Sequence, residues 1–249
     1  MRRPILWISL GFFLSGCNSF PLWRTSDSSQ NRRPIGRLNV NTRLDTFHPS
    51  AELRVKVDPT VCGTKRAPQS LLWNEGTKGV ENVVVWLEGP TLKPLSTDDT
   101  PRIVTSTKCE FSPRLLIVAP GTLIDFRNND PVLHSVRAQT KLNPPDYKVQ
   151  PPNLESVTMK FEKPEIIPLV NDMHPWMQAF IIVAAHSFYA VTDAKGEAKF
   201  LDIPEGSYRL KAWHEILGLQ EHPQSIEINM ETSGKTQSLT FIWADEPTP

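Results

Sequence analysis

Cysteine and glycine are scarce in this chain, and neither sign of charge is in excess. Its 249 residues include 3 cysteines and 12 glycines, and 27 basic side chains balance 27 acidic ones. Without net positive charge or a basic stripe with interleaved aromatic residues, nucleic acid is not expected as a partner. Proline is frequent, at 23 residues. Because proline interrupts helices and central sheet ladders, this abundance predicts an all-β protein of short strands joined by rigid turns.

The signatures of common enzyme families are also missing. The sequence has no G-x-S-x-G elbow, no H-E-x-x-H, no phosphate-binding glycine loop and no cysteine placed as a nucleophile. We therefore expect that the protein is not an enzyme.

The first seventeen residues, "MRRPILWISLGFFLSGC", have the layout of a secretory signal. Arg2 and Arg3 precede an apolar run that is too short to span a bilayer with ease. The stretch "LSGC" resembles the bacterial lipobox, which implies removal of residues 1–16 and acylation of Cys17 as a membrane anchor. Asn18, in place of aspartate, implies an outer-membrane lipoprotein facing the periplasm. The alternative is an ordinary signal peptide with a chance cysteine.

The other two cysteines are Cys62 and Cys109. An oxidising compartment outside the cytosol favours a disulfide between them. Such a bond would close a loop of about 48 residues and contribute roughly 3 to 4 kcal/mol. The alternative, a pair of thiolate ligands, is less favoured because neither cysteine lies in a C-x-x-C or C-x-x-H spacing.

The remaining sequence divides into three parts. Residues 17–50 are polar and lack strand alternation, which predicts a flexible tether. Strand-like runs follow in residues 51–185, including "ELRVKVD", "NVVVWLEG", "TLIDFRNND" and "AFIIVAAH", and predict an antiparallel β-sandwich. Residues 186–244 contain further hairpin patterns and predict a second, smaller β-sandwich module.

Two of these stretches resemble the ligand segments of cupredoxins. "GTLIDFRNNDPVLHSV" is similar to the strand and turn that deliver the first copper-ligand histidine, here His134. "NDMHPWM", residues 171–177, is similar to the loop Cys-x-x-His-x-x-Met, which implies His174 and Met177 as further ligands.

A wider resemblance covers about residues 52–244. Bacterial periplasmic proteins called methylamine-utilisation-like or plastocyanin-like join a cupredoxin-like Greek-key sandwich to a transthyretin-like or carboxypeptidase-regulatory-like module. The resemblance rests on eight motifs in the expected order: "VCG", "NVVVWLEG", "CEFSP", "NNDPVLHSV", "HPWM", "AVTDAKG", "IPEGSYRLKAWHE" and "LG".

One position departs from that pattern, because Asn171 stands where the cupredoxin loop has its cysteine. A blue-copper site requires that thiolate. The remaining His134, His174 and Met177 suit Cu(I), and water or Asn171 could complete a Cu(II) site. The alternative is that the metal has been lost, so that the histidines are hydrogen-bonded polar residues and Met177 fills the core.

His186 and His214 match places where the relatives also carry histidine. Either could bind a metal or be oriented by a carboxylate. We expect instead that they make buried hydrogen bonds between the two modules.

Two functions from different classes follow from these patterns. The first is an envelope lipoprotein whose modified site binds copper for storage, delivery or electron transfer, with a redox or copper-handling protein as partner. The alternative is a non-metal interaction module that contacts an envelope protein or polysaccharide.

Overall fold

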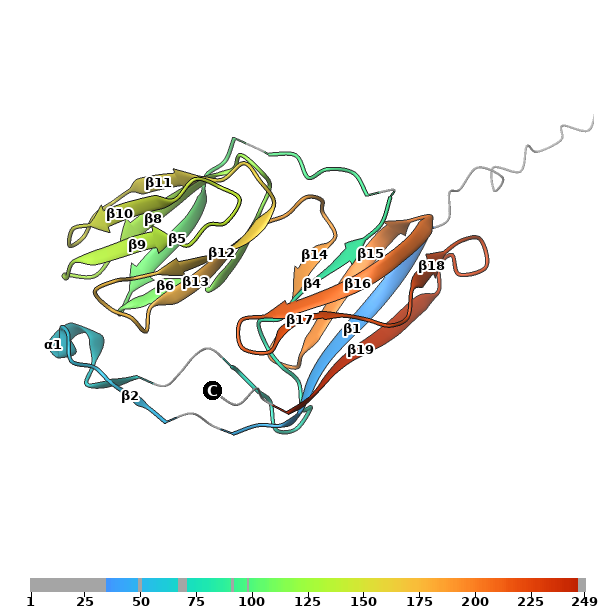
Figure 1. The fold of residues 1–249 in the computed structure, drawn as a ribbon, viewed down its shortest axis with the longest axis horizontal. Helices are drawn as coiled ribbons and strands as arrows, with labels where there is room; N and C mark the ends of the chain where they lie inside the picture. The colour runs from blue at the N-terminus through green and yellow to red at the C-terminus, as the bar shows by residue number, and fades with distance from the viewer. Residues whose placement is uncertain (1–34, 49–50, 67–70, 91, 98, 246–249) are drawn as a thin grey trace, which may run out of the picture. The chain divides into compact units, whose positions relative to one another are not determined.

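The computed structural model describes residues 35–48, 51–66, 71–90, 92–97 and 99–245 (Figure 1). The expected signal peptide, residues 1–16, and Cys17 lie outside this part of the chain. Within it, no helix is both long and apolar enough to cross a membrane.

The all-β prediction is confirmed, because the described residues form nineteen strands and one helix of four residues. The elements in chain order are β1 (Ile35–Thr46), β2 (Leu53–Arg54), α1 (Pro59–Cys62), β3 (Lys65–Arg66), β4 (Val84–Glu88), β5 (Arg102–Thr107), β6 (Glu110–Ser112), β7 (Leu115–Val118), β8 (Leu123–Asn128), β9 (His134–Ala138), β10 (Asp146–Gln150), β11 (Val157–Lys160), β12 (Glu165–Val170), β13 (Gln178–Val183), β14 (Tyr189–Val191), β15 (Glu197–Pro204), β16 (Gly206–His214), β17 (Gly218–Glu221), β18 (Ile226–Ile228) and β19 (Thr236–Asp245).

The first sandwich consists of a five-stranded sheet in the order β10-β9-β12-β13-β7 and a four-stranded sheet in the order β11-β8-β5-β6. Its core includes Phe126 of β8, Ile167 of β12 and Ile181 of β13, all fully buried. Alternation places Ile181 in this core, whereas its neighbour Ile182 packs in another cluster on the opposite face. Strand β13 is therefore buried on both faces, which explains its continuous apolar sequence.

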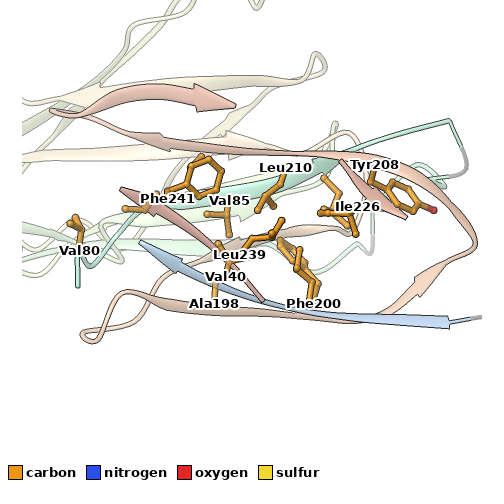
Figure 2. Close-up of a cluster of buried hydrophobic side chains, with 14 of the residues drawn as sticks. Val40, Val80, Val85, Ala198, Phe200, Tyr208, Leu210, Ile226, Leu239 and Phe241 are labelled. Carbon is orange, nitrogen blue, oxygen red and sulfur yellow. The ribbon is translucent and has the colours of Figure 1, made fainter. Parts of the chain in front are cut away.

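The second sandwich consists of a three-stranded sheet, β15-β1-β19, and a five-stranded sheet in which β14-β4-β16-β17 are joined by β18. Figure 2 shows Val40, Phe200 and Leu239 of the first sheet packed with Val85 and Leu210 of the second. The two sheets of the first sandwich contain nine strands and those of the second contain eight, so the second is the smaller of the two by one strand. Its relation to transthyretin-like modules stays a prediction.

Strand β1 corrects the expectation of a tether over residues 17–50 for the part that the structure describes, because Ile35–Thr46 form a strand. The strand pairs with β15 on one side and runs parallel to β19 on the other. Leu38, Val40 and Leu44 are fully buried in the second core. In "LNVNTRL" the intervening polar residues alternate with these apolar ones, which is the pattern of a strand with one buried face.

Strand β4 corrects the boundary that was placed between residues 185 and 186. It pairs with β14 and β16 of the second sandwich, although its sequence lies within the range 51–185. The second sandwich is thus assembled from β1, β4 and the segment from β14 onward. Hydrophobic alternation predicts that a segment forms a strand, but it does not specify the partner of that strand.

Candidate metal centre

The predicted ligand residues lie at one end of the first sandwich, on two segments of its five-stranded sheet. His134 is the first residue of β9, and Asn171 directly follows β12. His174 and Met177 belong to the loop between β12 and β13. Both histidines are fully buried, and Asn171 and Met177 are each 1% exposed.

The structure brings all four side chains together. Nδ1 of His134 lies 3.0 Å from Nδ1 of His174. The Asn171 side-chain nitrogen lies 3.0 Å from Nδ1 of His134 and 3.3 Å from Sδ of Met177. Two nitrogen ligands on one metal, each about 2 Å from it, are separated by about 3 to 4 Å. The histidine spacing therefore fits a shared ion.

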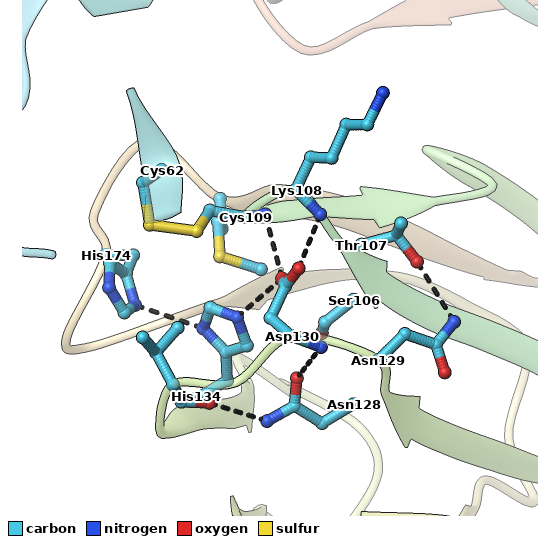
Figure 3. A network of polar contacts seen from close by, with 12 residues as sticks. Cys62, Ser106, Thr107, Lys108, Cys109, Asn128, Asn129, Asp130, His134 and His174 are labelled. Atoms are coloured by element: carbon cyan, nitrogen blue, oxygen red, sulfur yellow. Dashed lines mark hydrogen bonds and ion pairs between the residues drawn. A yellow bond between two sulfur atoms is a disulfide. The ribbon is translucent and has the colours of Figure 1, made fainter. Parts of the chain in front are cut away.

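A carboxylate holds the outer nitrogen of each histidine. Nε2 of His134 lies 2.9 Å from Oδ2 of Asp130, and Nε2 of His174 lies 3.0 Å from Oδ2 of Asp58. Figure 3 shows His134 between Asp130 and His174. Because an ionised carboxylate only accepts hydrogen bonds, each Nε2 carries its proton and donates. In a neutral ring with this tautomer, Nδ1 presents a lone pair.

The two Nδ1 lone pairs therefore point toward the same small space. At 3.0 Å, a shared proton or a metal ion between the two Nδ1 atoms would offset their repulsion, and the NH₂ group of Asn171 is placed to donate to Nδ1 of His134 from 3.0 Å. Burial lowers the pKa of His134; the hydrogen bond to Asp130 opposes this effect, and the nearby His174 adds to it. Carboxylate-oriented histidines of this kind are common around protein-bound metals.

The orientation of Asn171 keeps its oxygen away from this space. Its Oδ1 accepts hydrogen bonds from the backbone N–H groups of Met173 at 2.9 Å and His174 at 3.2 Å. Ser135 adds weaker contacts from its N–H and hydroxyl at 3.4 and 3.3 Å. The amide NH₂ therefore faces His134 and Met177, and an amide nitrogen of this kind is not a metal ligand. Asn171 borders the site without completing it.

Backbone hydrogen bonds close the loop that carries His174 and Met177. The Met177 N–H donates to the carbonyl of His174 at 2.8 Å, and the Asn171 N–H donates to the carbonyl of Met177 at 3.3 Å. Trp176 donates from its indole nitrogen to the carbonyl of Cys109 at 3.2 Å. These contacts fix the loop against the neighbouring strands and position its side chains.

Asp130 connects the site to the hairpin turn between β5 and β6. Lys108 and Cys109 in that turn have positive φ angles of 54° and 56°, which are costly for residues other than glycine. The Asp130 carboxylate accepts both of their N–H groups, at 2.6 and 2.8 Å. Asn128 in turn accepts the Asp130 N–H at 3.0 Å (Figure 3). One buried carboxylate thus orients His134 and stabilises the turn that carries Cys109.

The predicted disulfide between Cys62 and Cys109 is confirmed, with a Cα–Cα distance of 5.3 Å. Its position was not anticipated. The two sulfur atoms and an imidazole nitrogen of His174 all lie within 4.8 Å of one another, and the same limit holds for Cys109, Asp130 and His134. Sequence reasoning also missed Asp58 and Asp130 as partners of the histidines. The motif "NND" ahead of His134 was a signal for Asp130, whereas nothing in the sequence marked Asp58.

The structure does not add His186 or His214 to this site, because neither belongs to the converging ligand groups found among the described residues. Nδ1 of His186 accepts the N–H of Phe188 at 3.2 Å. His186 also has a hydrogen bond with the backbone of Leu87, whereas Nδ1 of His214 accepts the N–H of the nearby Ile216 at 3.2 Å.

No protein-family model and no curated protein matches this chain. Among solved structures, it is similar to amicyanin from Paracoccus versutus (Thiobacillus versutus), with 14% identity, a TM-score of 0.31 and coverage of 39% of this chain and 97% of that one. A purple cupredoxin from Nitrosopumilus maritimus is 16% identical, with a TM-score of 0.29 and coverage of 33% and 99%.

A third similar structure is the copper-containing nitrite reductase of Thermus scotoductus SA-01, which is 20% identical with a TM-score of 0.33. The match covers 39% of this chain but only 25% of the reductase chain. Similarities with TM-scores near 0.3 do not establish a function, which has to be argued from the side chains of the site.

Proposed function

We propose that the protein binds one copper ion, as Cu(I), through Nδ1 of His134, Nδ1 of His174 and Sδ of Met177. The convergence of the two Nδ1 atoms, with each Nε2 held by a carboxylate, carries this proposal. Imidazole and thioether ligands suit the soft Cu(I) ion. The chain orients these ligands through Asp130 and Asp58 and excludes water by burying both imidazoles completely.

The ligand set favours copper storage or delivery over electron transfer of the blue-copper type. That type of site requires a thiolate, and residue 171 provides an amide instead. The bound ion would lie nearest to solvent on the side of Asp58. The side chain of Asp58 is 38% exposed, whereas both imidazoles are fully buried. A copper-handling protein is therefore the expected partner, and it would exchange the ion at this side of the site.

Titration with Cu(I) against a chromophoric chelator tests this proposal. We expect one ion per chain in the oxidised protein and a loss of affinity of roughly tenfold or more in Met177→Leu. The matched control is Met159→Leu, because Met159 is a buried methionine of the same core, 2% exposed, outside the site. His134→Gln should lose copper as well, whereas His214→Gln should retain it.

Failure of copper to bind, or equal affinity in Met177→Leu and Met159→Leu, would contradict the proposal. The histidines would then share a proton, as a purely structural hydrogen-bonded pair. The alternative function would replace copper binding, with the sandwich acting as an interaction module for an envelope protein or polysaccharide.

We also propose that the protein is an outer-membrane lipoprotein facing the periplasm and has no enzymatic activity. The lipobox-like stretch "LSGC" supports anchoring through Cys17. The disulfide between Cys62 and Cys109 is in keeping with an oxidising compartment. The proposed membrane contact is made by acyl chains, while the folded residues remain outside the bilayer.

A further inference from the structure

The disulfide lies within ligand distance of the histidine pair. Its two sulfur atoms and a nitrogen of His174 lie within 4.8 Å of one another, and all three residues are buried. Two thiolates on one ion, each about 2.3 Å away, lie within about 4.6 Å of each other. Small movements would therefore be enough to place Cys62, Cys109 and His174 around a common ion once the sulfur atoms were no longer bonded.

We propose that reduction of the Cys62–Cys109 disulfide converts the site into a thiolate site, in which Cys62, Cys109 and His174 bind Cu(I) more tightly than the oxidised protein does. Thiolate is the ligand that the loop lost at position 171, and Cu(I) prefers it to thioether. This inference rests on the proposed copper function for the identity of the ion. The cysteines and their distances to His174 are independent of that function.

The chemical step is a thiol–disulfide exchange. A dithiol reductant supplies two electrons and two protons, the bond between the two sulfur atoms breaks, two thiols form, and the reductant becomes a disulfide. Binding of Cu(I) then displaces the two thiol protons into solvent and forms two sulfur–copper bonds.

The segment that carries Cys62 can supply the necessary movement. Strands β2 and β3 pair only with each other in the described chain, and α1 between them makes its backbone hydrogen bonds to Asp58. Apart from the disulfide, this segment is held by the contact of Asp58 with His174, by Arg66 and by Val55 and Val61 in the core. Cys109, by contrast, is fixed in its turn by Asp130. Reduction would therefore free Cys62 to move while Cys109 stays in place.

Copper binding and disulfide reduction are then thermodynamically linked. If reduction raises the Cu(I) affinity by a given factor, Cu(I) shifts the dithiol–disulfide equilibrium toward the dithiol by the same factor. For this two-electron couple, each tenfold factor corresponds to about 30 mV in midpoint potential. The midpoint potential of the dithiol–disulfide couple, measured with and without Cu(I), is therefore a second test. For a purely structural disulfide, Cu(I) would leave this potential unchanged.

The experiment compares oxidised and reduced protein under anaerobic conditions. Cu(I) affinity is measured by chelator competition before and after treatment with a phosphine, which takes up one oxygen atom from water as it reduces the disulfide. We expect at least a tenfold gain on reduction and, by X-ray absorption, an increase in sulfur neighbours of copper. The double variant Cys62→Ser with Cys109→Ser lacks the cross-link and has no thiolates. Its Cu(I) affinity should therefore be no higher than that of the oxidised wild-type protein.

An equal gain in the double serine variant would overturn the proposal, because opening of the segment alone would then explain it. Unchanged affinity on reduction, or loss of the folded near-ultraviolet signal in reduced protein with Cu(I), would overturn it too. The experiment distinguishes failure of this inference from failure of the proposed function. If the oxidised protein binds copper and reduction brings no gain, the proposed function holds and this inference is wrong. If copper binds through the cysteines, and binds only to the reduced protein, this inference holds and the proposed function is wrong.

Discussion

Nδ1 of His134 lies 3.0 Å from Nδ1 of His174, across 40 residues of sequence. The antiparallel register of β9 and β12 explains this distance, because Val170 pairs with Arg137 and Leu169 pairs with Ala138. Continued beyond β12, the same register carries the chain past the start of β9. The loop after Asn171 therefore reaches His134 as a direct consequence of strand pairing.

The orienting carboxylate of His174 can be tested by Asp58→Asn. The asparagine cannot offer a charged acceptor to Nε2, so the tautomer and orientation of the His174 ring should be less well controlled. We expect the Cu(I) affinity of the oxidised protein to fall roughly tenfold. Asp172→Asn is the matched control, because Asp172 lies in the loop that carries His174 but pairs with Arg137 at the surface rather than with this histidine. The distance between Nη2 of Arg137 and Oδ1 of Asp172 is 2.6 Å. Equal affinities in the two variants would remove Asp58 from the site.

Introducing a thiolate with Asn171→Cys is expected to create a blue copper site. The new sulfur would take the place of an amide nitrogen that lies 3.0 Å from Nδ1 of His134 and 3.3 Å from Sδ of Met177. With Cu(II), thiolate-to-copper charge transfer should give strong blue colour, while the natural protein stays pale.

The control for this variant is Asn171→Ser, which has a similar shape and no thiol, and it should stay pale. If Asn171→Cys is also colourless, and His134→Ala leaves copper uptake of the natural protein unchanged, the copper proposal is wrong and the interaction-module function should replace it.

Much of the first sandwich and the identity of the clustered side chains could be predicted from sequence. The run "AFIIVAAH" predicted a strand, and the spacing of "NDMHPWM" placed His174 and Met177 in one loop. Their meeting with His134 depends on which strands pair, and the sequence alone could not say whether His134 and His174 converge. The orientation of Asn171 could not be predicted, because it depends on N–H donors that the folded loop brings to its oxygen.

Contacts between residues that are far apart in sequence could not be predicted from local sequence patterns. Asp58 lies 116 residues before His174, and no spacing rule connects the two. Strand β1 was missed although Leu38 and Val40 alternate with polar residues, because its two partner strands lie more than 150 residues away in sequence and local patterns do not reveal them.

Removing the disulfide should destabilise the folded protein. Cys62 and Cys109 are separated by 47 residues, and a cross-link over such a loop restricts the unfolded chain. For the double serine variant we expect a loss of roughly 3 to 4 kcal/mol in the free energy of unfolding, measured with urea. Wild-type protein under reducing conditions without metal should unfold at nearly the same urea concentration as the variant. A variant as stable as the oxidised protein would contradict the prediction.

The proposed lipid anchor predicts a change in fractionation. Replacing Cys17 with serine removes the sulfur to which a lipid would be attached, so the protein should move from the membrane to the soluble fraction. Immunoblotting of the two fractions measures this change, and Ser19→Ala serves as the neighbouring control. Continued membrane association of Cys17→Ser would count against acylation.

The final prediction concerns His214, which is 1% exposed at the end of β16. Burial, the larger cause, and the positive charge of Arg114 together lower its pKa to about 4. Its Nε2 has no hydrogen-bond partner among the described residues, so a charged imidazole would be poorly accommodated. The neighbouring Glu215 has a pKa raised by burial, an effect that Arg114 opposes.

The lowered pKa of His214 fixes the sign of its contribution to stability. Between about pH 4 and 6.5 the unfolded chain binds a proton at this residue and the folded chain does not, so stability falls as the pH is lowered through this window. The loss attributable to His214 should approach roughly 3 kcal/mol near pH 4. Urea unfolding at several pH values should show this slope in the wild type and in His222→Gln. His214→Gln should show less of it, with the contribution of Glu215 common to all three proteins, and an undiminished slope in that variant would refute the assignment.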